Sequence, residues 1–330
     1  MFNEVVFTVF GWPIRWYGIT MALALLVATY LGQKLLDSRG RKGEYVWDGV
    51  IWAAIFGIVG ARAVYVLTNL KDYAGDWLSI FKTYEGGLSI HGALALGLFG
   101  CWLYYRRTPL KLLEVMDAMA PGVSIGIILV RFLGNLSNGD ILGYKVSKTV
   151  IPWALNFPND DYHLTAPIHD PSGAMQLIIP RHPTEIYGGI VGIILLALTL
   201  WVWSKKWAPG TNMFAFIGGY SIVRSIIEEP FRFVPHYFIK FYNETYGYGG
   251  VTMTQWASII LIAISIIGIV YVNRHAKPGV WDAPPEAAMA GAHAGKGGRA
   301  QTDAQSKPVR RRKPKPKDAA PKKKQKPFGK

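Results

Sequence analysis

Ionisable side chains interrupt several long apolar stretches of this sequence. At the centre of a membrane-spanning helix each costs about 2.5–3.5 kcal/mol, so such residues usually bind a charged group, move a proton or pair with one another. They are Arg62, His91, Asp117, Arg131, Glu185, Arg224 and Glu228. Two structural explanations compete with function: ion pairing between helices, and extension of a side chain from a helix end towards water. Asp117 is close enough to the end of a stretch to extend towards water or to cap a helix, so for this residue a structural and a functional reading both stay open.

The most regular polar set lies around residue 224. Tyr220, Arg224 and Glu228 are spaced by four, and Arg232 would continue the series. Residues four apart share one face of a helix, and Arg224 and Glu228 could simply pair there. Four polar groups in a row are nevertheless too polar to face lipid. We therefore expect this face to line the bundle interior or a water-filled cavity, in a functional role.

His91 stands in the segment EGGLSIHGAL, among glycines that allow close packing or a bend. A lone histidine on an apolar face is often only a packed core residue. Its position among small residues at the edge of an apolar stretch favours function instead. The histidines at 163, 169 and 182 show no spacing typical of a metal site, so no metal is expected.

Two further segments place polar groups at the ends of apolar stretches. The segment RFLGNLSNGDILG brings Asn135 and Asn138, three residues apart, close to Arg131. The segment RHPTEIY opens the next apolar stretch. Helix capping explains its threonine but leaves Glu185 without a structural role.

Helices that cross a membrane must position these side chains. A spanning helix needs about 20 mostly apolar residues, and seven stretches reach or approach that length. They are Trp16 to Leu36, Val46 to Leu67, Leu88 to Tyr105, Leu113 to Leu133, Ile186 to Trp203, Met213 to Ile227 and Val251 to Val272. The chain is 51% hydrophobic and only 17% charged, whereas soluble domains carry about 25% charged residues. The predicted fold is an all-α integral membrane protein with seven transmembrane helices.

The basic residues predict the orientation of these helices. Lysine and arginine gather in the loops after the first, third and fifth stretches and in the tail after the seventh. Because such residues collect on the cytoplasmic side, we expect the N-terminus outside and the C-terminus in the cytoplasm. The long segment 139–183, between the fourth and fifth helices, is then external. No basic residue precedes Arg15, which favours a retained first helix over a cleaved signal peptide.

Most of the net charge of +15 belongs to the tail. Residues 274–330 hold 16 basic and 4 acidic residues, which leaves only +3 for residues 1–273. The tail is rich in Ala, Gly, Pro and Lys, so we expect it to be a disordered cytoplasmic segment attracted to anionic membrane lipids. Its basic residues are not interleaved with aromatic ones, so nucleic acid is not an expected partner. The predicted domains are thus residues 1–273, which hold the transmembrane helices, and the tail, residues 274–330.

The single cysteine, Cys101, excludes a disulfide framework and a metal site built from several cysteines. It lies within an apolar run, where a cysteine usually serves as a small hydrophobic residue. We therefore expect it to be inert.

Five motifs, in order, resemble those of the bacterial prolipoprotein diacylglyceryl transferases. IRWYG at 14–18 resembles the family's opening motif, and GGLSIHG at 86–92 its histidine motif. GNLSNGDILG at 134–143 resembles its signature, RHPTEIY at 181–187 its HP[ST]QLYE segment, and Tyr220-x3-Arg224-x3-Glu228 its late arginine motif. The resemblance runs from about residue 14 to residue 274.

The signature departs from the family pattern in one important respect. It usually reads Gly-Arg-x-Gly-Asn, but here two residues separate Arg131 from Gly134. On an ideal helix the arginine would point about 100° away from its usual direction, unless a local bulge restores it. In addition, Asp140 stands where glutamate is common, Glu185 replaces a glutamine and Gly188 replaces a glutamate.

The resemblance implies transfer of the diacylglyceryl group of phosphatidylglycerol to the lipobox cysteine of a prolipoprotein. A thioether forms and glycerol phosphate leaves, with no cofactor. Arginine would bind the phosphate of the lipid. A histidine, whose reference pKa is near 6.5, would be a suitable base to accept the proton of the thiol. The expected location is the bacterial plasma (inner) membrane.

The resemblance also implies roles for individual residues. Those implied in catalysis are His91, Arg224, Tyr220 and Glu228. Those implied in substrate binding are Tyr17, Arg62, Arg131, Asn135, Asn138, Asp140, Gly143, Glu185 and Arg232.

Two other classes of function compete with this one. The same polar residues could line the pathway of a transporter or channel for an anionic solute or lipid. Against it stand the lack of internal repeats and of acidic proton-relay chains. A membrane scaffold with a basic tail would leave His91 and the polar face around Arg224 unexplained.

Overall fold

The computed structural model describes nine parts of the chain. They are residues 5–9, 12–73, 77–81, 87–138, 143–156, 180–233, 237–243, 245–276 and 281. Within them, seven helices of 16 to 24 residues match the seven predicted stretches. They are α1 (Trp16–Asp37), α2 (Tyr45–Thr68), α3 (Ile90–Tyr105), α4 (Leu112–Leu129), α6 (Thr184–Ser204), α7 (Thr211–Ile227) and α8 (Met253–His275).

Five of these helices are long and apolar enough to cross a membrane by length and composition. They are α1, α2, α4 with its extension to Asn135, α6 and α8. Helix α3 is apolar but has only 16 residues, and α7 has 17. The predicted multi-pass helical membrane protein is thus confirmed, while seven crossings and their orientation remain predictions.

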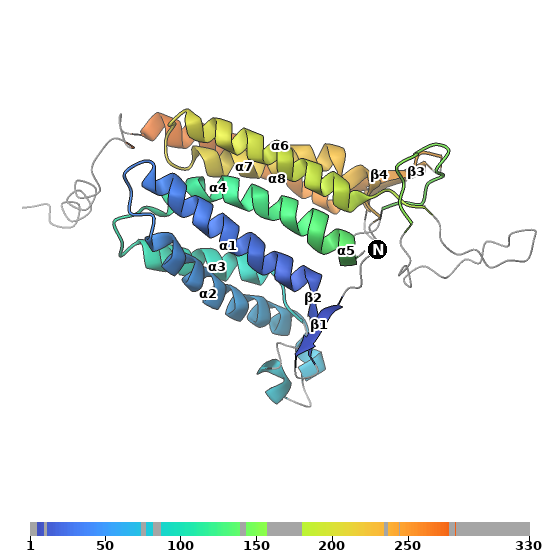
Figure 1. Cartoon of the computed structure of the whole chain (residues 1–330), viewed down its shortest axis with the longest axis horizontal. Coiled ribbons are helices and arrows are strands. Elements are labelled where there is room, and N and C mark those ends of the chain that lie inside the picture. The colour runs from blue at the N-terminus through green and yellow to red at the C-terminus, as the bar shows by residue number, and fades with distance from the viewer. Residues whose placement is uncertain are drawn as a thin grey trace, which may run out of the picture. The chain divides into compact units, whose positions relative to one another are not determined.

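The helices pack as neighbouring pairs (Figure 1). Helix α2 lies against α3, α1 lies between that pair and α4, and α6, α7 and α8 follow on the far side of α4. Small residues allow close approach within these pairs, as is typical of membrane helices. A Cβ on Gly60 would lie 2.4 Å from the carbonyl oxygen of Gly92, and one on Gly122 would lie 2.7 Å from the Cα of Ala28.

Helix α4 does not end as a regular α-helix. It continues as a π-helical turn, Val130–Asn135, followed by the short helix α5 (Leu136–Asn138). A π-turn holds one more residue than an α-turn, and such turns are frequent at functional sites. This is the local bulge that the spacing of Arg131 and Gly134 required.

Short elements lie outside the long helices. The sequence did not predict the two hairpins, β1 (Val5–Val9) with β2 (Trp12–Arg15), and β3 (Tyr237–Asn243) with β4 (Tyr248–Thr252). Among the described residues, 3-10 turns are present at Leu70–Tyr73, Trp77–Phe81 and Glu229–Phe231. Strands of four to seven residues are too short for their periodicity to be told from that of any other short apolar run.

A hydrophobic cluster closes one end of the helices and includes a residue of the tail. Trp281 is only 7% exposed and packs with Leu36, Val46 and Tyr105. Its ring lies 4.3 Å from the guanidinium of Arg39, and its Nε1 donates a hydrogen bond to the carbonyl oxygen of Trp207. The expectation of disorder from residue 274 therefore does not hold at Trp281. Residues 282–330 lie outside the described residues, and for them the expectation stays a prediction.

Candidate functional site

Two arginines and two carboxylates form a buried ionic chain where α4 and α7 end. Nη2 of Arg131 lies 2.9 Å from Oε1 of Glu228, whose other oxygen lies 3.6 Å from Nε of Arg224. Nη2 of Arg224 in turn lies 3.1 Å from Oε2 of Glu229. Glu228 and Glu229 are each 1% exposed. Alternating charges stabilise one another strongly at such depth, where solvent screening is weak.

The π-turn places Arg131 in this chain. Arg131 comes from the second position of the turn, and its side chain also packs on Gly188 of α6. A Cβ at that glycine would lie 2.7 Å from Nε of Arg131, so a larger residue there would displace the guanidinium. On an ideal helix the unusual spacing of the signature would turn Arg131 away. With the π-turn, Arg131 instead meets Glu228, which also pairs with Arg224.

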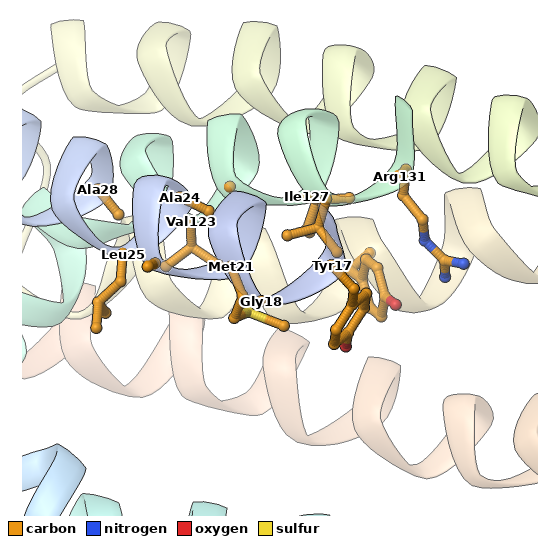
Figure 2. A pocket seen from close by; sticks show the side chains of 13 residues that line it. Tyr17, Gly18, Met21, Ala24, Leu25, Ala28, Val123, Ile127 and Arg131 are labelled. Atoms are coloured by element: carbon orange, nitrogen blue, oxygen red, sulfur yellow. The ribbon is translucent and has the colours of Figure 1, made fainter. Parts of the chain in front are cut away.

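An apolar groove ends at Arg131 (Figure 2). It has a volume of about 660 Å³ and runs between α1 and α4. Its walls are small and aliphatic residues, among them Ala24, Leu25 and Ile127, and Tyr17 and Arg131 form its polar end. Tyr220 also lines the groove. Within the described part of the chain, Nη1 of Arg131 is buried and has no hydrogen-bond partner. A donor in that state favours the binding of an anionic group at the end of the groove.

Arg224 lies one step behind this groove. Its guanidinium sits 5.6 Å from the centre of the Tyr220 ring, and Tyr220 itself lines the groove. Arg224 therefore does not line the groove itself. It contacts Tyr220, which lines the groove, and Glu228, which pairs with Arg131.

Arg232 does not continue the helical face formed by Tyr220, Arg224 and Glu228. Pro230 follows directly after Glu229, and α7 ends at Ile227 because proline cannot continue a helix. Arg232 instead forms an isolated antiparallel bridge with Gly143. The prediction that Arg232 belongs to this face is wrong.

No contact with the ionic chain is described for the other predicted residues of the signature and of RHPTEIY. Asn135 is buried at the end of the π-turn, and Asn138 ends α5. Asp140 lies outside the described residues. The carbonyl of Gly143 accepts a hydrogen bond from the buried Arg181, and Glu185 is fully buried in the first turn of α6.

Arg62 is committed to the backbone of the segment before α3. Its Nε and Nη2 donate to the carbonyl oxygens of Ile80 and Ser79, each at 2.6 Å, and Nη1 donates to that of Gly87. These contacts explain a buried arginine without a lipid phosphate. Arg62 thereby holds the turn that leads into the histidine motif.

The structure does not bring His91 to the ionic chain. His91 is the second residue of α3, which packs on α2, and its side chain is exposed. None of its described contacts is with Arg131, Arg224 or Glu228.

His182 joins a hydrogen-bonded row beside α6. Its Nε2 lies 2.8 Å from the carbonyl oxygen of Tyr246, so Nε2 carries the proton and Nδ1 accepts from the Tyr187 hydroxyl at 2.9 Å. That hydroxyl accepts from Nε1 of Trp153. Burial lowers the pKa of His182 below its usual 6.5, because the charged imidazolium would lose its hydration.

Asp117 has a structural role. Its two carboxylate oxygens accept hydrogen bonds from the backbone amides of Gly210 and Met213, each at 2.8 Å. These amides belong to the first turn of α7, whose N-terminus favours a negative charge. Of the two readings of Asp117, capping is the one that the structure supports.

Comparison with known proteins decides the family. The family described as prolipoprotein diacylglyceryl transferase matches residues 4–271. A phosphatidylglycerol–prolipoprotein diacylglyceryl transferase of Thermus thermophilus is 35% identical over 262 residues, which cover 77% of this chain and 92% of that protein. A protein of the same name from Neisseria meningitidis is 33% identical over 279 residues, covering 82% and 95%. The chain belongs to the prolipoprotein diacylglyceryl transferase family.

Membership of this family confirms the predicted class of enzyme. A third relative of the same name, from Deinococcus radiodurans, is 33% identical over 290 residues, with 80% of this chain and 84% of that protein covered. The chain is a transferase, and the transporter and scaffold readings are set aside.

Sequence reasoning missed two residues that complete the site of this diacylglyceryl transferase family member. Glu229 pairs with Arg224, and Thr252 donates a hydrogen bond to Glu229 at 3.0 Å. The rule of four along a helix selects Glu228 but not Glu229, because α7 has already ended there. The signal that could have found Glu229 is the Glu-Glu-Pro sequence itself, a second acid just before a helix-breaking proline.

Proposed function

We propose that the groove between α1 and α4 holds the diacylglyceryl part of phosphatidylglycerol, with the lipid phosphate at Arg131. The chain transfers this diacylglyceryl group to a prolipoprotein. The observation that carries the proposal is that Arg131, with an unpartnered Nη1 within the described residues, stands at the polar end of an apolar groove. A lipid with acyl chains and an anionic headgroup has the same division of polarity.

The chemistry needs only charge stabilisation and a proton acceptor. The thiolate of the acceptor cysteine attacks the glycerol carbon that carries the phosphate, a C–S bond forms, and the C–O bond to the phosphate breaks. The two electrons of that bond leave with glycerol phosphate, whose additional negative charge Arg131 binds, with Arg224 close behind. Tyr17 and Tyr220 orient the headgroup from the walls of the groove.

We propose that His91 is the base that accepts the proton of the thiol. A thiol reacts as its thiolate, with a usual pKa of about 8.5, and a histidine is a suitable base near neutral pH. His91 is exposed at the start of α3, so the acceptor has to present its cysteine there. Glu228 serves by holding Arg131 and Arg224 rather than by accepting this proton.

The proposed orientation puts this chemistry on the outer side of the bacterial plasma membrane. The π-turn, the end of α7 and the start of α3 lie at the helix ends opposite the loops that carry Arg39, Arg41 and Arg106. Basic loops favour the cytoplasmic side. A secreted prolipoprotein would then meet the site after its signal peptide has entered the membrane.

The test blocks the groove without touching its polar end. Ala22 of α1 is exposed and lines the groove, whereas its neighbour Leu23 is exposed and does not line it. Ala22→Trp should raise the KM for phosphatidylglycerol at least about tenfold, because the indole occupies acyl-chain space, and Leu23→Trp should leave it within about twofold. The readout is the mass increase of a lipobox peptide incubated with purified protein and phosphatidylglycerol. Equal KM values for both variants would place the lipid elsewhere.

A further inference from the structure

Arg224 is held by two carboxylates of unequal strength. It lies 3.1 Å from Glu229 but 3.6 Å from Glu228, and Glu228 gives its shorter contact, 2.9 Å, to Arg131. Close ion pairs in a buried site are much stronger than longer ones. Glu229 thus takes the main pairing of Arg224 and leaves Glu228 to Arg131.

Glu229 is itself fixed from α8. Its Oε1 accepts a hydrogen bond of 3.0 Å from the Thr252 hydroxyl, and Thr252 is the N-cap of α8. The same hydroxyl oxygen accepts from the backbone amide of Gln255 at 3.1 Å. The Gln255 side chain donates to the carbonyl oxygen of Ser225, next to Arg224, at 2.9 Å. The first turn of α8 therefore grips both the backbone beside Arg224 and the carboxylate that pairs with its side chain.

We infer that Glu229, anchored by Thr252, is a positioning residue that keeps Glu228 available to Arg131. Without the charge of Glu229, Arg224 would turn to Glu228, the only other carboxylate that it contacts among the described residues. Arg131 would then share or lose its partner and leave the end of the groove. Glu229 does not line the groove and would act entirely through Arg224. The inference rests on the proposed role of Arg131.

The first experiment separates positioning from charge. Glu229→Gln removes one negative charge from the chain of ions, which by itself favours an anionic lipid. If only charge mattered, the KM for phosphatidylglycerol would fall and kcat would stay. The inference expects kcat per folded molecule to fall at least about tenfold and the KM for phosphatidylglycerol to rise, because the displaced Arg131 no longer binds the lipid phosphate and a lost charge-assisted contact has about that effect. An unchanged kcat overturns the inference.

A double-mutant cycle tests the anchor. Thr252→Val keeps the charge of Glu229 but removes its hydrogen bond, and should lower kcat severalfold, while Thr252→Ser restores it. In the double variant Glu229→Gln/Thr252→Val, kcat should be no lower than in Glu229→Gln alone, because both changes remove one connection. Multiplying effects would show that the two residues act separately and would reject the anchor.

Gln255→Ala supplies the matched structural control. It removes the capping contacts of α8 but leaves the hydroxyl of Thr252 to Glu229. It should lower Tm as Thr252→Val does, with kcat retained. If Gln255→Ala lowers kcat equally, general loosening of α8 explains the data and the inference fails. Arg131→Lys in the same assay separates this failure from failure of the proposed function. Full activity of that variant would show that the lipid phosphate does not bind at Arg131.

Discussion

Arg131 and Glu228 stand 97 positions apart in the sequence and meet at 2.9 Å. The contact joins the π-turn after α4 to the end of α7, and Glu228 also touches Arg224 one turn earlier on α7. A single buried carboxylate thus contacts two arginines, although Glu229 makes the closer contact with Arg224. A substitution that displaces Arg131, Arg224 or Glu228 should therefore also shift the side chains of the other two.

Replacing either arginine with lysine should impair transfer while the protein stays folded. Lysine keeps the charge but lacks the planar, forked donor group, so it cannot bind Glu228 and a phosphate together. Because the π-turn directs Arg131 into the ionic chain, Arg131→Lys should be as damaging as Arg224→Lys, with kcat/KM down about 10- to 100-fold. The measurement is turnover by detergent-purified protein, together with a thermal-unfolding curve for each variant to show that its Tm matches that of the parent. A fully active Arg131→Lys would contradict the proposed phosphate site.

Deletion of Leu133 should be tolerated. Leu133 lies in the π-turn and is 47% exposed, and its removal gives Arg-Phe-Gly-Asn, the usual spacing of the family signature. The turn can then become α-helical without rotating Arg131 away. We expect activity within about threefold of the parent, since few contacts are lost. Deletion of Leu198 from the regular helix α6 is the control, and should abolish folding or activity because no bulge absorbs it. Equal loss in both would count against this account of the π-turn.

His91→Asn should lower turnover by about 10²- to 10⁴-fold, the usual contribution of a general base. Asparagine retains a hydrogen-bonding group but cannot accept the thiol's proton. The exposed position of His91 means that the fold should tolerate the change, which an unchanged Tm would verify. Near-normal turnover of His91→Asn would show that the residue only donates or accepts a hydrogen bond. Full activity of His91→Ala would show that His91 does not belong to the active site.

Trp281 should be the part of the tail that stabilises the fold. A chain ending at residue 277 lacks this buried ring and should lose about 3 kcal/mol of stability, as expected for removing a buried tryptophan. A chain ending at residue 289 keeps Trp281 and should match the full chain in Tm. Both should retain turnover per folded molecule, because the tail contributes nothing to the groove in the described structure. Trp281→Ala in the full chain should reproduce the shorter truncation, and an unchanged Tm for it would refute the packing role.

Stability should fall as the pH drops from 7 to 5, in part through His182. Its folded-state pKa lies below the usual 6.5, so at acid pH the unfolded chain binds the proton more readily than the folded one. The stabilisation is therefore complete above about pH 6.5 and is lost as the pH falls below it. His182→Gln should be less stable at pH 7 but show a weaker dependence of Tm on pH. A parallel pair of Tm curves would assign the pH dependence to other groups.

The apolar runs predicted the long helices well. Helix α1 begins at Trp16 as expected and extends one residue further, and α6 begins two residues before the predicted Ile186. The reason is that the length of a membrane-spanning helix is set by bilayer thickness, which a hydropathy pattern reports directly. Contacts between distant segments leave no such local trace.

The site was only partly predictable for that reason. Spacing of four identified the common face of Tyr220, Arg224 and Glu228, because the first two lie within α7 and Glu228 is its C-cap residue, still in helical conformation. The same rule failed for Arg232, where Pro230 ends the helix. The carbonyl partners of Arg62 and the hydroxyl of Thr252 come from segments with no recognisable pattern, so only the folded chain shows them.

The π-turn at Val130–Asn135 has a consequence for tracing this signature through related chains. Position along a helix is normally counted in residues, and a gap inside a helix is treated as improbable. Here Arg131 pairs with Glu228 although two residues instead of one separate it from Gly134, because the surplus residue widens one turn instead of rotating what precedes it. In such a helix the partner of a side chain identifies its position better than its distance along the sequence does.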